Sequence, residues 1–198
     1  MIEITSITEI RNHLQSLKAI VFDLDDTLYG EKEYVRSGYR AIAATLPQVE
    51  QMEEKLWQAF EQKKSAIDEI LKSEGIYTKE LKQKCLSVYR FHQPEIHFYE
   101  GVKELLVQLC ADGYKLGIIT DGRPEGQNAK IKALGLDELV DHIIVTDELG
   151  GMEYRKLNKE AFVRMQKQFD VNYSEMCYVG DNIKKDFVAP EQLGMGCI

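Results

Sequence analysis

After His97 the chain alternates short apolar runs with helical patterns, and this alternation constrains the fold more than any other feature. Together with an earlier apolar run, the strands it predicts are 19–22, 116–120, 142–146 and 176–179. The helices it predicts are 102–111, 127–134 and 158–169, with a last helical turn toward residue 193. Alternating strands and helices favour a parallel sheet covered on both faces. We therefore expect an α/β fold with a Rossmann-like core.

The residues before His97 have a different character. Residues 6–18 predict an amphipathic helix, because Ser6 and Glu9 have the spacing of a capping box. From about Glu31 to His97 the sequence is charged and helical, without a strand pattern. We expect one α/β core, residues 1–30 plus 98–198, carrying a helical insertion, residues 31–97.

Composition excludes several classes of protein. The 198 residues carry a formal net charge of -8, the wrong sign for a protein that binds nucleic acid through its phosphates. The longest apolar runs fall far below the roughly 20 residues of a membrane-spanning helix. The four cysteines form no close pair, and the N-terminus lacks a signal-peptide pattern. We expect a cytoplasmic protein that binds neither membrane nor nucleic acid.

Polar residues follow each predicted strand. In open parallel sheets ligands bind at the carboxyl ends of the strands, so these residues are the candidate site. They are Asp23 and Asp25, then Thr120, Asp121 and Gly122, then Lys156, and finally Asp181 and Asp186. Crowded carboxylates repel one another unless a cation neutralises them, and Mg²⁺ prefers oxygen ligands. Lys156 would add positive charge for a phosphoryl group.

These motifs resemble those of the haloacid dehalogenase-like superfamily, in its branch with a helical cap after the first core strand. The match covers Asp-x-Asp-x-Thr at Asp23, Thr120 after the next strand, Lys156 before a helix, and Gly-Asp at Asp181 with a further acid. The resemblance implies that the insertion is the cap and that catalysis passes through an aspartyl phosphate.

The resemblance also implies a role for each residue. Asp23 would be the nucleophile, Asp25 the general acid and base, and Thr120 and Lys156 the groups that bind phosphate, with Asp121 and Gly122 beside them. Mg²⁺ would be held by Asp23, the backbone carbonyl of Asp25, and Asp181, with Asp186 a ligand through water or a support for Lys156.

Three departures from the family pattern matter. Leu157 replaces the usual proline after the lysine, and Asp121 replaces the usual asparagine, so we expect Asp121 to point away or to pair, with Arg123 as one candidate partner. The family usually continues past the position of Ile198, so we expect an edge strand to be missing or very short.

We expect a magnesium-dependent phosphatase acting on a small phosphomonoester, a sugar phosphate or a nucleotide, as a monomer or homodimer. A phosphomutase, a dehalogenase and a regulatory or binding module with low turnover are the alternatives. The family's dehalogenases lack the second aspartate, so Asp25 favours phosphoryl chemistry.

Overall fold

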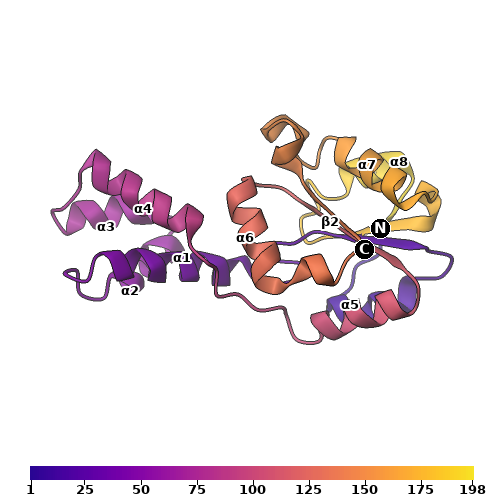
Figure 1. Cartoon of the computed structure of the whole chain (residues 1–198), viewed down its shortest axis with the longest axis horizontal. Helices are drawn as coiled ribbons and strands as arrows, with labels where there is room; N and C mark the ends of the chain where they lie inside the picture. Colours follow the sequence, from indigo (N-terminus) through magenta and orange to yellow (C-terminus); the bar gives the residue numbers. More distant parts are fainter. The chain divides into compact units, whose positions relative to one another are not determined.

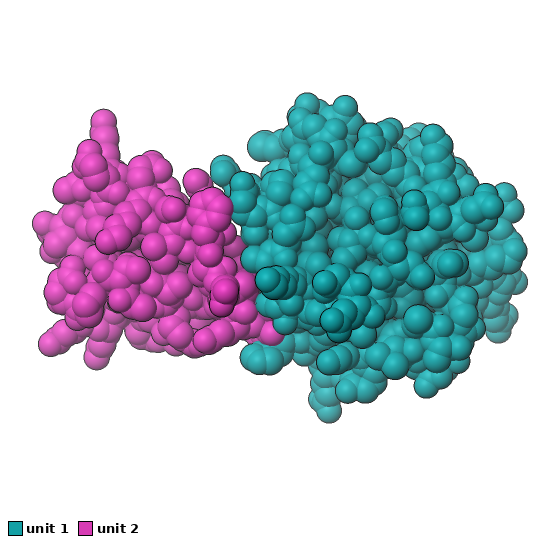
Figure 2. Space-filling view, viewed as in Figure 1, with its two compact units in different colours: residues 1–31, 97–198 teal, residues 32–96 magenta.

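The computed structural model describes residues 1–198 and divides them into two compact units. Unit 1 comprises residues 1–31 and 97–198, and unit 2 comprises residues 32–96 (Figure 2). The junctions lie one residue from the predicted ones. None of the helices has the length and apolar character needed to span a bilayer.

Unit 1 is built on a parallel sheet of five strands in the order β3-β2-β1-β4-β5 (Figure 1). The strands are β1 (Ala19–Phe22), β2 (Lys115–Thr120), β3 (His142–Val145), β4 (Met176–Val179) and β5 (Gly196–Cys197). All four residues of β1 and all four of β4 are buried, as expected for strands covered on both faces. The predicted α/β fold is confirmed.

Helices cover both faces of this sheet. They are α5 (Val102–Ala111), α6 (Pro124–Leu134), α7 (Glu160–Phe169) and α8 (Val188–Leu193). Figure 1 shows α5 and α6 on one side of the sheet and α7 and α8 on the other. Beneath α7, Phe162 and Met165 pack with Val21 and Tyr178 of the sheet in one buried apolar cluster.

Five short 3₁₀ helices complete unit 1, η1 (Ile7–His13), η2 (Leu136–Glu138), η3 (Thr146–Leu149), η4 (Met152–Tyr154) and η5 (Tyr173–Glu175). The α-helix predicted over residues 6–18 is therefore wrong. Ser6 does cap the segment, but the turn ends at His13, and Ile10 is its one buried residue. Residues three apart align in a 3₁₀ helix, which suits the spacing of Ile7 and Ile10.

Two helices begin at other residues than predicted. Helix α6 begins three residues early, at Pro124, because proline suits the first turn of a helix. Helix α7 begins at Glu160 rather than at residue 158, because the side chain of Asn158 accepts a hydrogen bond from the Glu160 amide. Strand β5, at one edge of the sheet, has two residues.

Unit 2 contains four helices, α1 (Glu31–Thr45, whose first residue belongs to unit 1), α2 (Met52–Glu61), α3 (Ala66–Ser73) and α4 (Lys79–Phe91). They share a core that includes Ile42, Leu56, Leu71 and Cys85, all fully buried. The predicted absence of a strand from this segment is confirmed.

Backbone contacts join the two ends of unit 1 at which the insertion departs and returns. The Tyr99 amide donates to the Leu28 carbonyl at 3.0 Å, and Tyr29 forms an antiparallel bridge with Phe98. The chain of unit 1 therefore resumes beside the point where it left.

Candidate active site

The candidate site lies where the helices change sides of the sheet. Helices α5 and α6 follow β1 and β2 on one side, whereas α7 leads to β4 on the other, so the switch falls between the neighbouring strands β1 and β4. Asp23 follows β1 and Asp181 lies two residues after β4. Parallel sheets bind ligands at this crevice.

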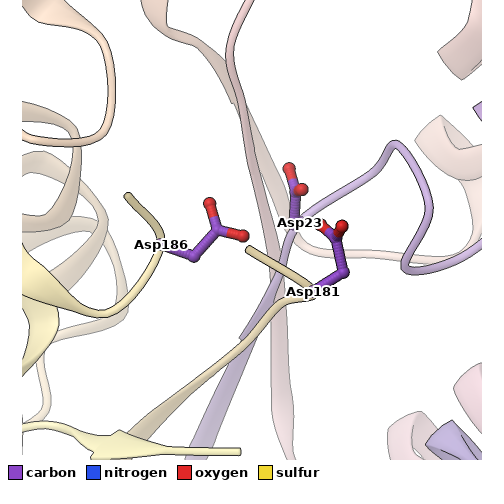
Figure 3. Close-up of side chains that lie close together, drawn as sticks. All are labelled: Asp23, Asp181 and Asp186. Atoms are coloured by element: carbon purple, nitrogen blue, oxygen red, sulfur yellow. The ribbon is translucent and has the colours of Figure 1, made fainter. Parts of the chain in front are cut away.

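Three carboxyl groups meet there, those of Asp23, Asp181 and Asp186. Each offers an oxygen within 4.8 Å of the others, and Figure 3 shows the three side chains facing a common space. Asp23 and Asp186 are buried and Asp181 is exposed. The sequence predicted that these three acids lie at one site, and the structure brings them together.

Lys156 supplies positive charge to two of these acids. Its Nζ lies 2.5 Å from Asp23 Oδ1 and 2.8 Å from Asp186 Oδ1, and its side chain is fully buried. Burial opposes the charged amine, but Asp23 and Asp186 outweigh it, so the pKa of Lys156 is raised. Lys156 is therefore a fixed cation at the floor of the site.

Burial dominates the electrostatics of the acids. It raises the pKa of Asp23 to about 7, although Lys156 opposes the shift, and Asp186 adds to it. Burial and the neighbouring Asp186 also raise the pKa of Asp181. A raised pKa means that the positive charges and hydrogen-bond donors near a carboxyl group do not fully offset the cost of burying its negative charge.

Asp25 has a separate set of partners. Lys130 Nζ lies 2.7 Å from its Oδ1, and Gln127 donates to its Oδ2 at 2.9 Å. The hydroxyl of the fully buried Tyr29 also donates to Oδ1. Burial raises the pKa of Asp25, but Lys130 and the two hydrogen-bond donors outweigh it, so the pKa is lowered.

Sequence reasoning missed Lys130 and Gln127. Both lie on α6, which buries Gln127, Lys130, Ile131 and Leu134. Positions 127, 131 and 134 have the spacing of one helix face, and that face also includes 130. The presence of Gln127 and Lys130 on the same helix face as Ile131 and Leu134 could have indicated that both have buried partners.

The last residue of β2 and the loop that follows it border the same region. Thr120 is fully buried, and its Oγ1 accepts a hydrogen bond from Gln127 at 2.5 Å. Gly122 has a φ of 142°, which L side chains rarely adopt, and a Cβ there would lie 3.2 Å from Gln127.

Asp121 does pair, but with partners other than the suggested Arg123. Asp121 Oδ1 accepts from the Thr146 hydroxyl at 2.9 Å and from the Lys156 amide at 3.0 Å. These two hydrogen bonds hold the segment that carries Lys156, so the Asp121 carboxylate has a structural role. Leu157, where the family usually has proline, is 64% exposed and leaves Lys156 in place.

A cavity of about 420 Å³ opens over these residues. Its lining includes Asp25, Asp121, Lys156, Asp181 and Lys185. The cavity is large enough for a small polar molecule and mixes acidic with basic groups.

The donor set fits a divalent metal ion. The carboxyl oxygens of Asp23, Asp181 and Asp186 lie within 4.8 Å of one another, and burial raises the pKa of Asp23 and of Asp181. A divalent cation among them would offset the cost of ionising these acids, and carboxylate oxygens are the ligands that Mg²⁺ prefers. The three clustered acids could hold the ion, whereas the side chain of Asp25 is already engaged by Lys130.

Comparisons with known proteins agree with this geometry. The model of the haloacid dehalogenase-like hydrolase family matches residues 20–198. The glyceraldehyde 3-phosphate phosphatase of Methanocaldococcus jannaschii is 31% identical over 90% of this chain and 82% of its own. Pyrophosphatase PpaX of Halalkalibacterium halodurans is 27% identical over 84% of this chain and 75% of its own.

The fold recurs in a solved structure, a haloacid dehalogenase-superfamily hydrolase of subfamily IA from Geobacter sulfurreducens. The TM-score is 0.66 at 15% identity, over 92% of this chain and 86% of that one. The names of the curated relatives agree with the predicted phosphatase activity, and the predicted hydrolase class is confirmed. With Asp23, Thr120, Lys156 and Asp181 gathered at the switch point of the sheet, the chain belongs to the haloacid dehalogenase-like hydrolase family.

Proposed function

We propose that this protein is a magnesium-dependent phosphatase that hydrolyses a small phosphomonoester through a phosphorylated Asp23. The observation that carries the proposal is the contact of Lys156 with both Asp23 and Asp186 beside Asp181, 2.5 and 2.8 Å from the two buried carboxylates. A nucleophilic carboxylate, a fixed cation and a set of oxygen ligands for a metal are the parts that phosphoryl transfer requires.

The first half-reaction forms the aspartyl phosphate. A carboxylate oxygen of Asp23 attacks phosphorus, the bond from phosphorus to the ester oxygen breaks, and Asp25 gives its proton to the departing alkoxide. Lys156 and the Thr120 hydroxyl hold the phosphoryl oxygens during the transfer.

The second half-reaction regenerates the enzyme. Asp25, now ionised, takes a proton from water, the water oxygen attacks phosphorus, and the bond to Asp23 breaks to release inorganic phosphate. The donors around Asp25 favour its ionised form, which this step requires, whereas the first half-reaction requires its protonated form.

Asp23, Asp181 and the backbone carbonyl of Asp25 would hold Mg²⁺, with Asp186 a ligand through water or a support for Lys156. The ion would neutralise the negative charge that builds up between the phosphoryl group and its anionic nucleophile.

Sugar phosphates are the substrate class that we propose first, ahead of nucleotides. The support is the relative named glyceraldehyde 3-phosphate phosphatase, which is more similar to this chain than the pyrophosphatase PpaX described above. The cavity of about 420 Å³ suits a phosphorylated molecule of a few carbon atoms.

Hydrolysis of p-nitrophenyl phosphate by the purified protein tests the proposal. Release that requires Mg²⁺, stops with chelator and is absent from Asp23→Asn would support it. Activity that persists in Asp23→Asn would identify a different nucleophile or a contaminant.

Failure of the wild-type protein on the aryl phosphate would call for a second measurement. Binding of beryllium fluoride, which mimics the phosphoryl group of an aspartyl phosphate, would then indicate an intact site with a selective substrate. No binding would favour the regulatory module over the phosphatase.

A further inference from the structure

Helix α6 turns two polar side chains into the interior of unit 1. Gln127 is 3% and Lys130 5% exposed, and they share the buried face of the helix with Ile131 and Leu134. Burying an ammonium group costs free energy that an apolar side chain at the same position would not incur. A buried lysine therefore needs a negatively charged partner that offsets this cost.

That partner is Asp25, and both side chains end on it. Lys130 Nζ lies 2.7 Å from Oδ1, and Gln127 Nε2 lies 2.9 Å from Oδ2. Tyr29 donates to Oδ1 as well. Because different donors hold the two oxygens, rotation of the carboxyl group breaks at least one contact.

The two buried lysines of the site divide its acids between them. Lys156 contacts Asp23 and Asp186, whereas Lys130 contacts Asp25. Gln127 also donates to Thr120 Oγ1 at 2.5 Å, so a side chain of α6 connects Asp25 with the Thr120 hydroxyl at the end of β2. This arrangement fixes Asp25 relative to Thr120 independently of Lys156.

We propose that Lys130, assisted by Gln127, is a positioning residue that fixes the Asp25 carboxyl in the orientation needed for proton transfer. The inference rests on the proposed function, in which Asp25 is the acid and base. Lys130 acts through Asp25 and is not itself a catalytic residue.

A kinetic double-mutant cycle tests this role with p-nitrophenyl phosphate and Mg²⁺. The four proteins are the wild type, Lys130→Met, Asp25→Asn and the double variant. General acid–base catalysis contributes about 10²–10⁴-fold, so loss of orientation in Lys130→Met should lower kcat by about 10- to 100-fold and change KM by less than about twofold. In the Asp25→Asn background the same substitution should change kcat by less than about twofold.

Lys132→Met is the matched control, because Lys132 lies on the same helix, is exposed and carries the same charge. It should leave kcat unchanged. If Lys130→Met does not fold, Gln127→Met keeps the ion pair but removes the bonds to Asp25 Oδ2 and to Thr120 Oγ1. It should lose about 3- to 10-fold in kcat, and the loss should be smaller in the Asp25→Asn background, where only the bond to Thr120 matters.

Three outcomes would overturn the inference. A loss of kcat of equal size with and without Asp25 would assign Lys130 a general structural role, and a loss confined to KM would assign it to substrate binding. A wild-type protein that shows neither metal-dependent hydrolysis nor beryllium fluoride binding would refute the proposed function, and this inference with it.

Discussion

Replacing Asp23 with asparagine should stabilise the metal-free protein at neutral and alkaline pH. Asp23 is 3% exposed, and burial raises its pKa from 3.8 to about 7 against the opposing charge of Lys156. Between these two pH values the folded protein binds a proton that the unfolded chain has released. The free energy of unfolding of the wild type therefore falls as the pH rises through this window.

The magnitude follows from the size of the shift. Each pKa unit corresponds to about 1.4 kcal/mol, so a shift of about three units costs the folded wild type about 4 kcal/mol above pH 7. Asparagine has nearly the same shape and no charge to desolvate. The advantage of Asp23→Asn over the wild type should be about 3 kcal/mol larger at pH 8 than at pH 5.

Urea unfolding at pH 5, 6, 7 and 8 in the presence of chelator measures this difference. Asp137→Asn, which removes an exposed carboxylate by the same substitution, is measured in parallel as the control. An advantage of Asp23→Asn that stays constant from pH 5 to pH 8, or that shrinks as the pH rises, would refute the reasoning. The same variant is inactive under the proposed mechanism, so stability and activity should move in opposite directions.

The remaining predictions concern a cation and two glycines. Lys156→Met leaves two buried acids without their partner, so it should lower the free energy of unfolding at pH 8 by about 3–5 kcal/mol. The loss should be smaller at pH 5, where Asp23 is protonated, and urea unfolding at the two pH values measures the difference. Gly180→Ala places a Cβ 2.8 Å from Asp186 Oδ2, so the buried carboxylate must shift, and titration calorimetry should find Mg²⁺ affinity reduced; unchanged affinity would favour Asp186 as a support for Lys156 over Asp186 as a ligand. Gly38→Ala places a Cβ 2.5 Å from the ring of Tyr89 within unit 2 and should cost about 1–3 kcal/mol, whereas an unaltered thermal unfolding curve would show that the ring can move aside.

The sequence was sufficient to predict the acids of the site because they follow buried strands. A strand that is apolar on both faces gives a strong signal, and its end fixes where Asp23 and Asp181 must lie. The topology then brings these ends to one edge of the sheet. The helix predicted over residues 6–18 was wrong because capping and apolar spacing are shared by short 3₁₀ turns and α-helices.

The partners of these acids were harder to predict, because they depend on contacts between distant segments. Asp121 could be paired with Arg123 on proximity alone, yet it bonds to Thr146 and to the backbone of Lys156, 25 and 35 residues further along the chain. Lysine is usually a surface residue, and only the packing of α6 within unit 1 turns Lys130 inward.

The hydrogen bond between Leu28 and Tyr99 and the bridge between Tyr29 and Phe98 have a consequence for how this architecture can diversify. They hold together the two points at which the inserted segment leaves and rejoins unit 1. The distance that the insertion must span is therefore the same whatever its length. The entropy of closing a loop grows only with the logarithm of its length, about 0.6 kcal/mol for each doubling. An insertion anchored in this way can be lengthened, shortened or exchanged at small cost to the folding of the core.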